Sequence, residues 1–99
     1  MIVVTKKPGE KPLIVEIENK LSELQRIVGG HIEIVQLAQK IVVICDDKGK
    51  QKGYAPNLRY GVDTLVGTVI FAGVEGEELK SLNDGQLVLV ANFCSAFEV

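Results

Sequence analysis

The spacing of apolar residues changes near residue 30, and this change predicts a helix followed by a strand. From about residue 19 to 28, apolar side chains recur every three or four positions, as on the buried face of a helix. Asn19 is a suitable N-cap, and Gly29-Gly30 supplies the left-handed residue that commonly ends a helix. From residue 31 to 36 the apolar side chains alternate, which is the period of a strand with one buried face.

Four further apolar runs predict strands, at residues 2–5, 13–17, 41–45 and 65–72. The run 41–45 is apolar at every position, so we expect a central strand that is buried on both faces. The first strand is expected at a sheet edge, where it is available for pairing between chains.

Polar segments separate these strands. Pro8-Gly9 is typical of a turn, and residues 46–50 are expected to turn with Gly49 in the left-handed conformation. Residues 55–61 are expected to form an irregular loop, and residues 73–80 a polar loop.

The C-terminal third predicts a second helix, over about residues 83–96. Residues 81–84 resemble a capping box, and Leu87, Val90, Ala91 and Cys94 recur at helical spacing. The run 87–90 alone would also suit a strand. Short turns between the strands and two helices predict one α+β domain over residues 1–99, with a mixed, mostly antiparallel sheet and helices at about 19–28 and 83–96.

Composition limits the classes of function. The chain has 99 residues, of which 46% are hydrophobic, and 11 basic against 13 acidic residues give a net charge of −2. A nucleic-acid-binding protein normally carries a basic face, so we expect no nucleic-acid partner. The first apolar run is too short for a signal peptide or a membrane span, which predicts no membrane association and a cytoplasmic location.

Few residues are suited to catalysis or metal binding. One histidine, with Cys45 and Cys94 far apart, cannot complete a zinc site, so we expect no metal and no cofactor. Both thiols are expected to be free and buried. His31 and Glu33 lie two apart on a predicted strand and could act as an acid–base pair, but no nucleophile is identifiable near them. We therefore expect no catalytic residues and a protein that is not an enzyme.

The segment from Tyr54 to Tyr60 is the first candidate binding site. Asn57 offers an amide, Arg59 a guanidinium group, and the two tyrosines aromatic faces, which together suit a nucleobase and its phosphates. An ordinary surface loop fixed by Pro56 is the alternative.

The turn that begins at Asp46 is the second candidate. Asp46 and Asp47 are adjacent carboxylates that could hold Mg²⁺ or a ribose diol, and the amides of the turn, including that of Lys48, could hold an anion. A solvated hairpin turn is the alternative.

Several short motifs resemble a family of small proteins of unknown function that are common in bacteriophages, prophages and other mobile elements. Together they span most of the chain: Lys7-Pro8-Gly9, Ile17-Glu18-Asn19, Val28-Gly29-Gly30-His31-Ile32-Glu33, Asp46-Asp47-Lys48-Gly49-Lys50, Pro56-Asn57-x-Arg59 and Val66-Gly67-Thr68. The chain departs from the family pattern at His31, where a bulky residue is usual, and at Leu58, which separates Asn57 from Arg59. The resemblance implies a small accessory protein in a bacterial host cytoplasm and no particular chemistry.

These observations favour a binding module. In the context that the resemblance implies, we expect a counter-defence protein that sequesters a nucleotide-derived immune signal without turnover, in a homo-oligomer. The alternative is an inhibitor or adaptor that blocks a host protein by surface contact. A concave site that joins Asn57, Arg59 and the turn at 46–50 would favour the small ligand, and an apolar patch around residues 62–65 would favour the protein partner.

Overall fold

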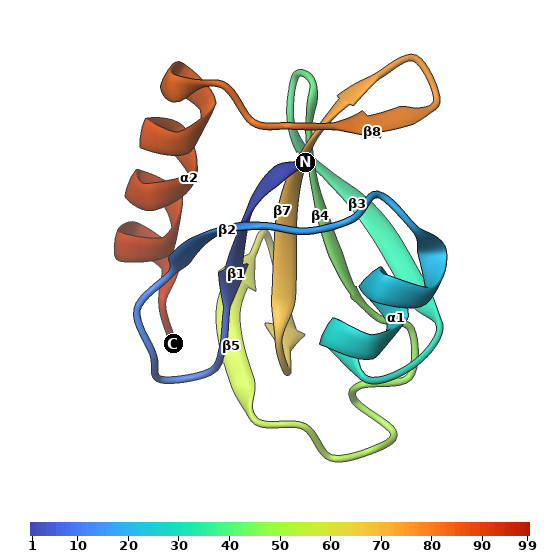
Figure 1. Cartoon of the computed structure of the whole chain (residues 1–99). Helices are drawn as coiled ribbons and strands as arrows, with labels where there is room; N and C mark the ends of the chain where they lie inside the picture. The colour runs from blue at the N-terminus through green and yellow to red at the C-terminus, as the bar shows by residue number, and fades with distance from the viewer.

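The computed structural model describes all 99 residues of the chain, folded as an antiparallel sheet with helices on both faces (Figure 1). The elements in chain order are β1 (Ile2–Lys6), β2 (Leu13–Glu16), α1 (Leu21–Val28), β3 (Ile32–Ala38), β4 (Ile41–Asp46), β5 (Pro56–Tyr60), β6 (Asp63–Val66), β7 (Val69–Glu75), β8 (Glu78–Lys80) and α2 (Asp84–Phe97).

The main sheet has the strand order β2-β1-β7-β4-β3, and β8 pairs with β7. Every pairing in it is antiparallel. Strands β5 and β6 form a separate two-stranded sheet. The α+β class, the mostly antiparallel sheet and both helices are therefore confirmed.

Strands β4 and β7 form the centre of the core because their side chains are buried on both faces. Ile44 and Ile70 point to one face of the sheet, where Leu24 and Val28 of α1 cover them. On the opposite face, Val43 and Phe71 share a core cluster with Val90 and Cys94 of α2 and with Leu58 of the β5–β6 hairpin. Figure 1 shows α1 and α2 on opposite sides of the sheet.

Strand β1 does not lie at the edge of the sheet, contrary to the prediction. It pairs with β2 on one side and β7 on the other. Val3 and Val4 are both buried, one on each face, which is the environment of an interior strand. The edge position next to β1 belongs to β2.

The sequence predicts a loop over residues 55–61, but Pro56–Tyr60 is strand β5. Leu58 is fully buried and pairs with Leu65 of β6. One apolar residue among polar neighbours carries little periodic signal, so the tertiary contact decides the conformation.

The expected polar loop 73–80 is also largely strand, since β7 continues to Glu75 and pairs with β8. The expected strand at 65–72 is interrupted, because Gly67 has φ +73° and separates β6 from β7.

The ends of the helices differ in detail from the predictions. Lys20 is the N-cap of α1, and the side chain of Asn19 instead donates to Leu79 O at 3.0 Å. The capping box of α2 is formed by Asn83 and Gln86. Gly29 ends α1 with φ +99°, as expected. Neither helix combines the length and the apolar character needed to cross a membrane.

Candidate ligand-binding site

Asp46, at the end of β4, is buried and fixed by hydrogen bonds. Its carboxylate accepts from Lys52 Nζ at 2.7 Å and from the Lys48 amide at 2.8 Å. Burial by itself raises the pKa of Asp46. The bonds from Lys52 and from the Lys48 amide, helped by the Tyr54 hydroxyl, outweigh burial and hold the pKa below its usual value. Asp46 therefore stabilises the turn that follows β4.

Tyr54 is enclosed by three glycines from different parts of the chain. A Cβ atom would lie 2.7 Å from the Tyr54 hydroxyl at Gly29, 3.2 Å from its ring at Gly49, and 2.5 Å from its ring at Gly67. Gly49 does not have the predicted positive φ, which occurs at Gly53 instead. At Gly49 a Cβ atom would also lie 3.0 Å from Val66 Cγ2, so this close approach favours glycine there rather than the backbone conformation. The three glycines together leave room for the tyrosine side chain.

A cavity of about 310 Å³, which we call the polar cavity, lies between the turn after β4 and strand β6. Of the residues predicted from the sequence it brings together Asp46, Asp47 and Lys48. The lining includes four acidic residues, Glu33, Asp46, Asp47 and Asp63, against Lys48 and Lys50. An excess of carboxylates disfavours a phosphate-bearing ligand in this cavity.

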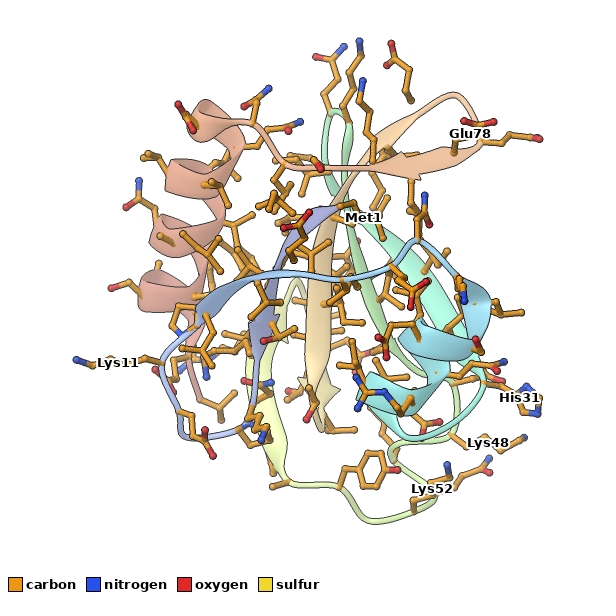
Figure 2. The ribbon with its side chains drawn as sticks, in the orientation of Figure 1. Met1, Lys11, His31, Lys48, Lys52 and Glu78 are labelled. Atoms are coloured by element: carbon orange, nitrogen blue, oxygen red, sulfur yellow. The ribbon has the colours of Figure 1, made fainter.

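Cys45 also lines the polar cavity, but its thiol is protonated at neutral pH. Burial raises the pKa of Cys45 to about 11, and the neighbouring Glu33 carboxylate adds to the effect. The Cys45 thiol donates to Glu33 Oε1 at 3.8 Å. His31 is exposed and points away from the body of the protein, on the same side as Lys48 (Figure 2).

The second concave surface, which we call the basic groove, lies beside α1. It consists of two depressions of about 330 and 400 Å³ that share Thr68 in their walls. Its lining residues come from β1 and β2, the turn after β1, α1, and the segments before β5 and β7: Thr5, Lys7, Pro8, Val15, Ile17, Arg26, Ile27, Val28, Tyr54, Ala55, Gly67 and Thr68.

The basic groove carries two cations and no carboxylate. Lys7 makes no ion pair, and Arg26 pairs through Nε with Glu23 Oε1 at 2.5 Å. Both cations and the hydroxyl groups of Thr5 and Thr68 line the depression of about 400 Å³. The half-buried Tyr54 lines the depression of about 330 Å³. Cations, hydroxyls and an aromatic ring along one groove can bind phosphate at one end and an apolar or aromatic group at the other.

The structure does not bring the other predicted residues into either concave surface. Asn57 is fully buried, and its amide donates at 2.8 Å to both Lys6 O and Gly67 O. Arg59 is exposed on β5, and the Tyr60 hydroxyl donates to the carbonyl of Gln36. Of the 54–60 segment, only Tyr54 and Ala55 line the basic groove.

Sequence reasoning missed Lys7, Arg26, Thr5 and Thr68. These residues come from three separate segments, with Thr5 and Lys7 at the end of β1, Arg26 on α1 and Thr68 before β7, and each by itself is an ordinary polar residue. Two of the short motifs point toward the groove: Val66-Gly67-Thr68 supplies Thr68 and the glycine against Tyr54, and Lys7-Pro8-Gly9 supplies Lys7 and Pro8.

No curated protein and no solved structure matches the chain. The family model described as a domain of unknown function, DUF3846, matches residues 1–95, so the chain belongs to the DUF3846 family.

Proposed function

We propose that this protein binds a nucleotide-derived, phosphate-bearing small molecule in the basic groove and releases it unchanged. In a phage or prophage such a protein would act in counter-defence, by sequestering an immune signal in the cytoplasm of the bacterial host. The observation that carries the proposal is the convergence of Lys7, Arg26, Thr5 and Thr68 on one groove that continues to Tyr54.

The charges of the groove favour an anionic ligand. Lys7 has no anionic partner within the protein, so a phosphate group would meet a free ammonium group. Glu23 occupies one side of the Arg26 guanidinium group, which leaves the remaining N–H groups for a ligand. The ion pair is exposed, so it can be exchanged for a phosphate contact at little cost.

Binding without turnover is supported by the composition of the groove. No carboxylate, imidazole or thiol lines it, and Lys7 and Tyr54 are the only lining residues of a type that serves as a general base. Burial raises the pKa of each cysteine to about 11, and neither thiol lies in the groove.

A protein–protein inhibitor or adaptor of a host enzyme is the second candidate. Val62, at the tip of the β5–β6 hairpin, is fully exposed at 110%. Leu65, which the sequence groups with Val62, is 6% exposed and belongs to the core. A single exposed valine is a small contact surface, so this hairpin favours the small-ligand proposal.

The test is thermal unfolding against ADP-ribose derivatives, cyclic dinucleotides and plain nucleotides. A ligand at a hundredfold its Kd adds about 2.7 kcal/mol to the free energy of unfolding. For a domain of this size that corresponds to a rise in Tm of about 10 °C or more. The ligand should be recovered intact by mass spectrometry after the protein is denatured.

Matched variants locate the site. Arg26→Ala and Lys7→Ala should abolish the rise in Tm, and Arg59→Ala, an exposed residue outside the groove, should leave it unchanged. Glu23→Gln should strengthen binding, because it frees the Arg26 guanidinium group. A panel that produces no shift overturns the proposal for these compounds, and recovery of a cleaved product overturns binding without turnover.

A further inference from the structure

Helix α2 carries no charge after its first residue, the exposed Asp84. Residues 85–97 contain no charged side chain. Val90 and Cys94 face the core and are buried, but Val88 is 61% exposed and Leu89 43% exposed. A helix on the surface of a protein normally carries charged residues on the face opposite the core. The outer face of α2 therefore resembles a contact surface more than a solvated one.

The outer residues of α2 follow the spacing of a helix–helix seam. One exposed stripe recurs at intervals of three and four residues and consists of Gly85, Val88, Leu89, Asn92 and Ala96, with Ala91 and Ser95 exposed beside it. Small residues at both ends of this stripe allow a second helix to approach closely. The spacing points to a helix as the partner element.

We infer that the outer face of α2 is covered by α2 of a second copy of this chain, packed antiparallel about a two-fold axis. Charge is the first argument for a second copy. The stripe bears no charge, so it can meet itself without like-charge repulsion and without burying an unpaired ion. A helix that lies on a membrane surface normally carries Lys or Arg on its polar face, and residues 85–97 contain neither.

Asn92, the one polar residue of the stripe, is the second argument. An antiparallel pair with its two-fold axis at Asn92 places Val88 of one copy opposite Ala96 of the other, so a larger side chain meets a smaller one. The two Asn92 amides then lie side by side. Each amide has N–H donors and a carbonyl acceptor, so the two Asn92 side chains can form hydrogen bonds with each other. A paired asparagine within an apolar seam also fixes the register of the helices.

Strand β2 extends the same surface. An apolar hollow of about 120 Å³ lies between β2 and α2, lined by Val4, Pro12, Ile14, Leu87 and Ala91. Ile14 is 64% exposed and Leu13 57% exposed. The outer side of β2 pairs with no strand, because β2 is the last strand of the sheet. The hollow and the open edge give a partner side chain somewhere to insert.

The available area suits a dimer of standard size. Such an interface removes about 800 Å² from each partner, which is about a seventh of the 5845 Å² of accessible surface of this chain. The molecule measures 31 × 29 × 21 Å, so one face that includes both α2 and β2 can supply that share. The basic groove uses other residues, so the inference does not depend on the proposed function.

Sedimentation equilibrium over a concentration series tests the inference. The unmodified chain should form a dimer, and Leu89→Glu should raise the dimer dissociation constant by about 30-fold or more, the cost of losing a central interface residue. Ile34→Glu is the matched control, since Ile34 is 48% exposed on β3 at the opposite edge of the sheet. A chain that stays monomeric at about 100 µM overturns the inference.

Cross-linking gives a second test that does not depend on the stability of the glutamate variant. Asn92→Cys should place a thiol close to its own copy across the two-fold axis, and it leaves the apolar residues of the stripe in place. The native cysteines are buried. Under mild oxidation Asn92→Cys should form a covalent dimer much faster than Ser22→Cys on the exposed side of α1. Equal rates for the two variants overturn the inference.

Discussion

Lys6 and Asn57 exchange two hydrogen bonds in the interior of the protein. Lys6 Nζ donates to Asn57 Oδ1 at 3.0 Å, and Asn57 Nδ2 donates back to Lys6 O at 2.8 Å. The ammonium group, fully buried, also pairs with Glu98 Oε2 at 3.0 Å. This network joins β1, β5 and the residues after α2. Its polar groups satisfy one another, which is the condition for burying an ammonium group at tolerable cost.

Removing the Asn57 side chain should destabilise the protein. Asn57→Ala removes the side-chain donor from the carbonyl groups of Lys6 and Gly67 and one acceptor from the Lys6 ammonium group. Each buried polar group left unsatisfied costs about 1–3 kcal/mol. We expect a loss of at least that size in the free energy of unfolding, measured by urea denaturation.

Arg59→Ala is the control for this experiment, because Arg59 is exposed on the same strand. Its effect should stay within about 0.5 kcal/mol, as at most surface positions. Comparable losses for the two variants would contradict a structural role for the buried Asn57 amide.

Gly67 and Gly61 provide a matched pair for testing the enclosure of Tyr54. Both have positive φ, +73° and +63°. A Cβ at Gly61 meets nothing within 4 Å, whereas at Gly67 it would lie 2.5 Å from the Tyr54 ring. Gly61→Ala should therefore cost about 1–2 kcal/mol from backbone strain alone. Gly67→Ala should cost about 1–3 kcal/mol more, because the ring or the backbone must move. Equal urea midpoints would contradict the close packing of Tyr54.

The elements that the sequence predicts well are those whose signal is local. The residues of β4 are apolar at every position up to Cys45, and α1 ends where Gly29 takes a positive φ. The register of β5 depends instead on Leu58 reaching the core and on Leu65 lying opposite, and neither condition is visible in residues 55–61. Its assignment as a loop failed because a distant contact overrides a weak local preference.

The difference between local signals and distant contacts also explains which site residues could be predicted. Asp46, Asp47 and Lys48 are neighbours in sequence and share the polar cavity. Asn57 carries the same functional group whether it binds a ligand or the backbone, so residue type could not reveal its buried partners. Lys7 and Arg26 come together only through the packing of α1 beside β1 and β2, which no short motif encodes.

The two cysteines should resist thiol reagents in the folded protein. Burial is the main reason that the pKa of each, Cys45 and Cys94, is about 11. Almost none of either thiol is ionised at neutral pH, and both are shielded from solvent. Reaction with Ellman's reagent should be slow without denaturant and complete in urea. Glu33→Gln should quicken the reaction of Cys45 only modestly, because burial contributes more to its pKa than the carboxylate does. Rapid labelling of the native protein would contradict this burial.

Asp46 should make stability depend on acid pH. Its pKa in the folded protein lies below the ordinary value of 3.8, so the folded state binds its proton less readily than the unfolded state. The stabilisation that the Asp46 carboxylate provides is complete at pH values above its pKa in the unfolded protein. It is lost as the pH falls through the pKa of Asp46 in the folded protein. Urea denaturation from about pH 7 down to about pH 2.5 should show a wild-type advantage over Asp46→Asn that shrinks below about pH 4. Lys52→Met should lose much of the same advantage, because Lys52 provides the largest contribution that lowers the pKa of Asp46. A difference between wild type and Asp46→Asn that stays constant with pH would show that the carboxylate charge does not stabilise the fold.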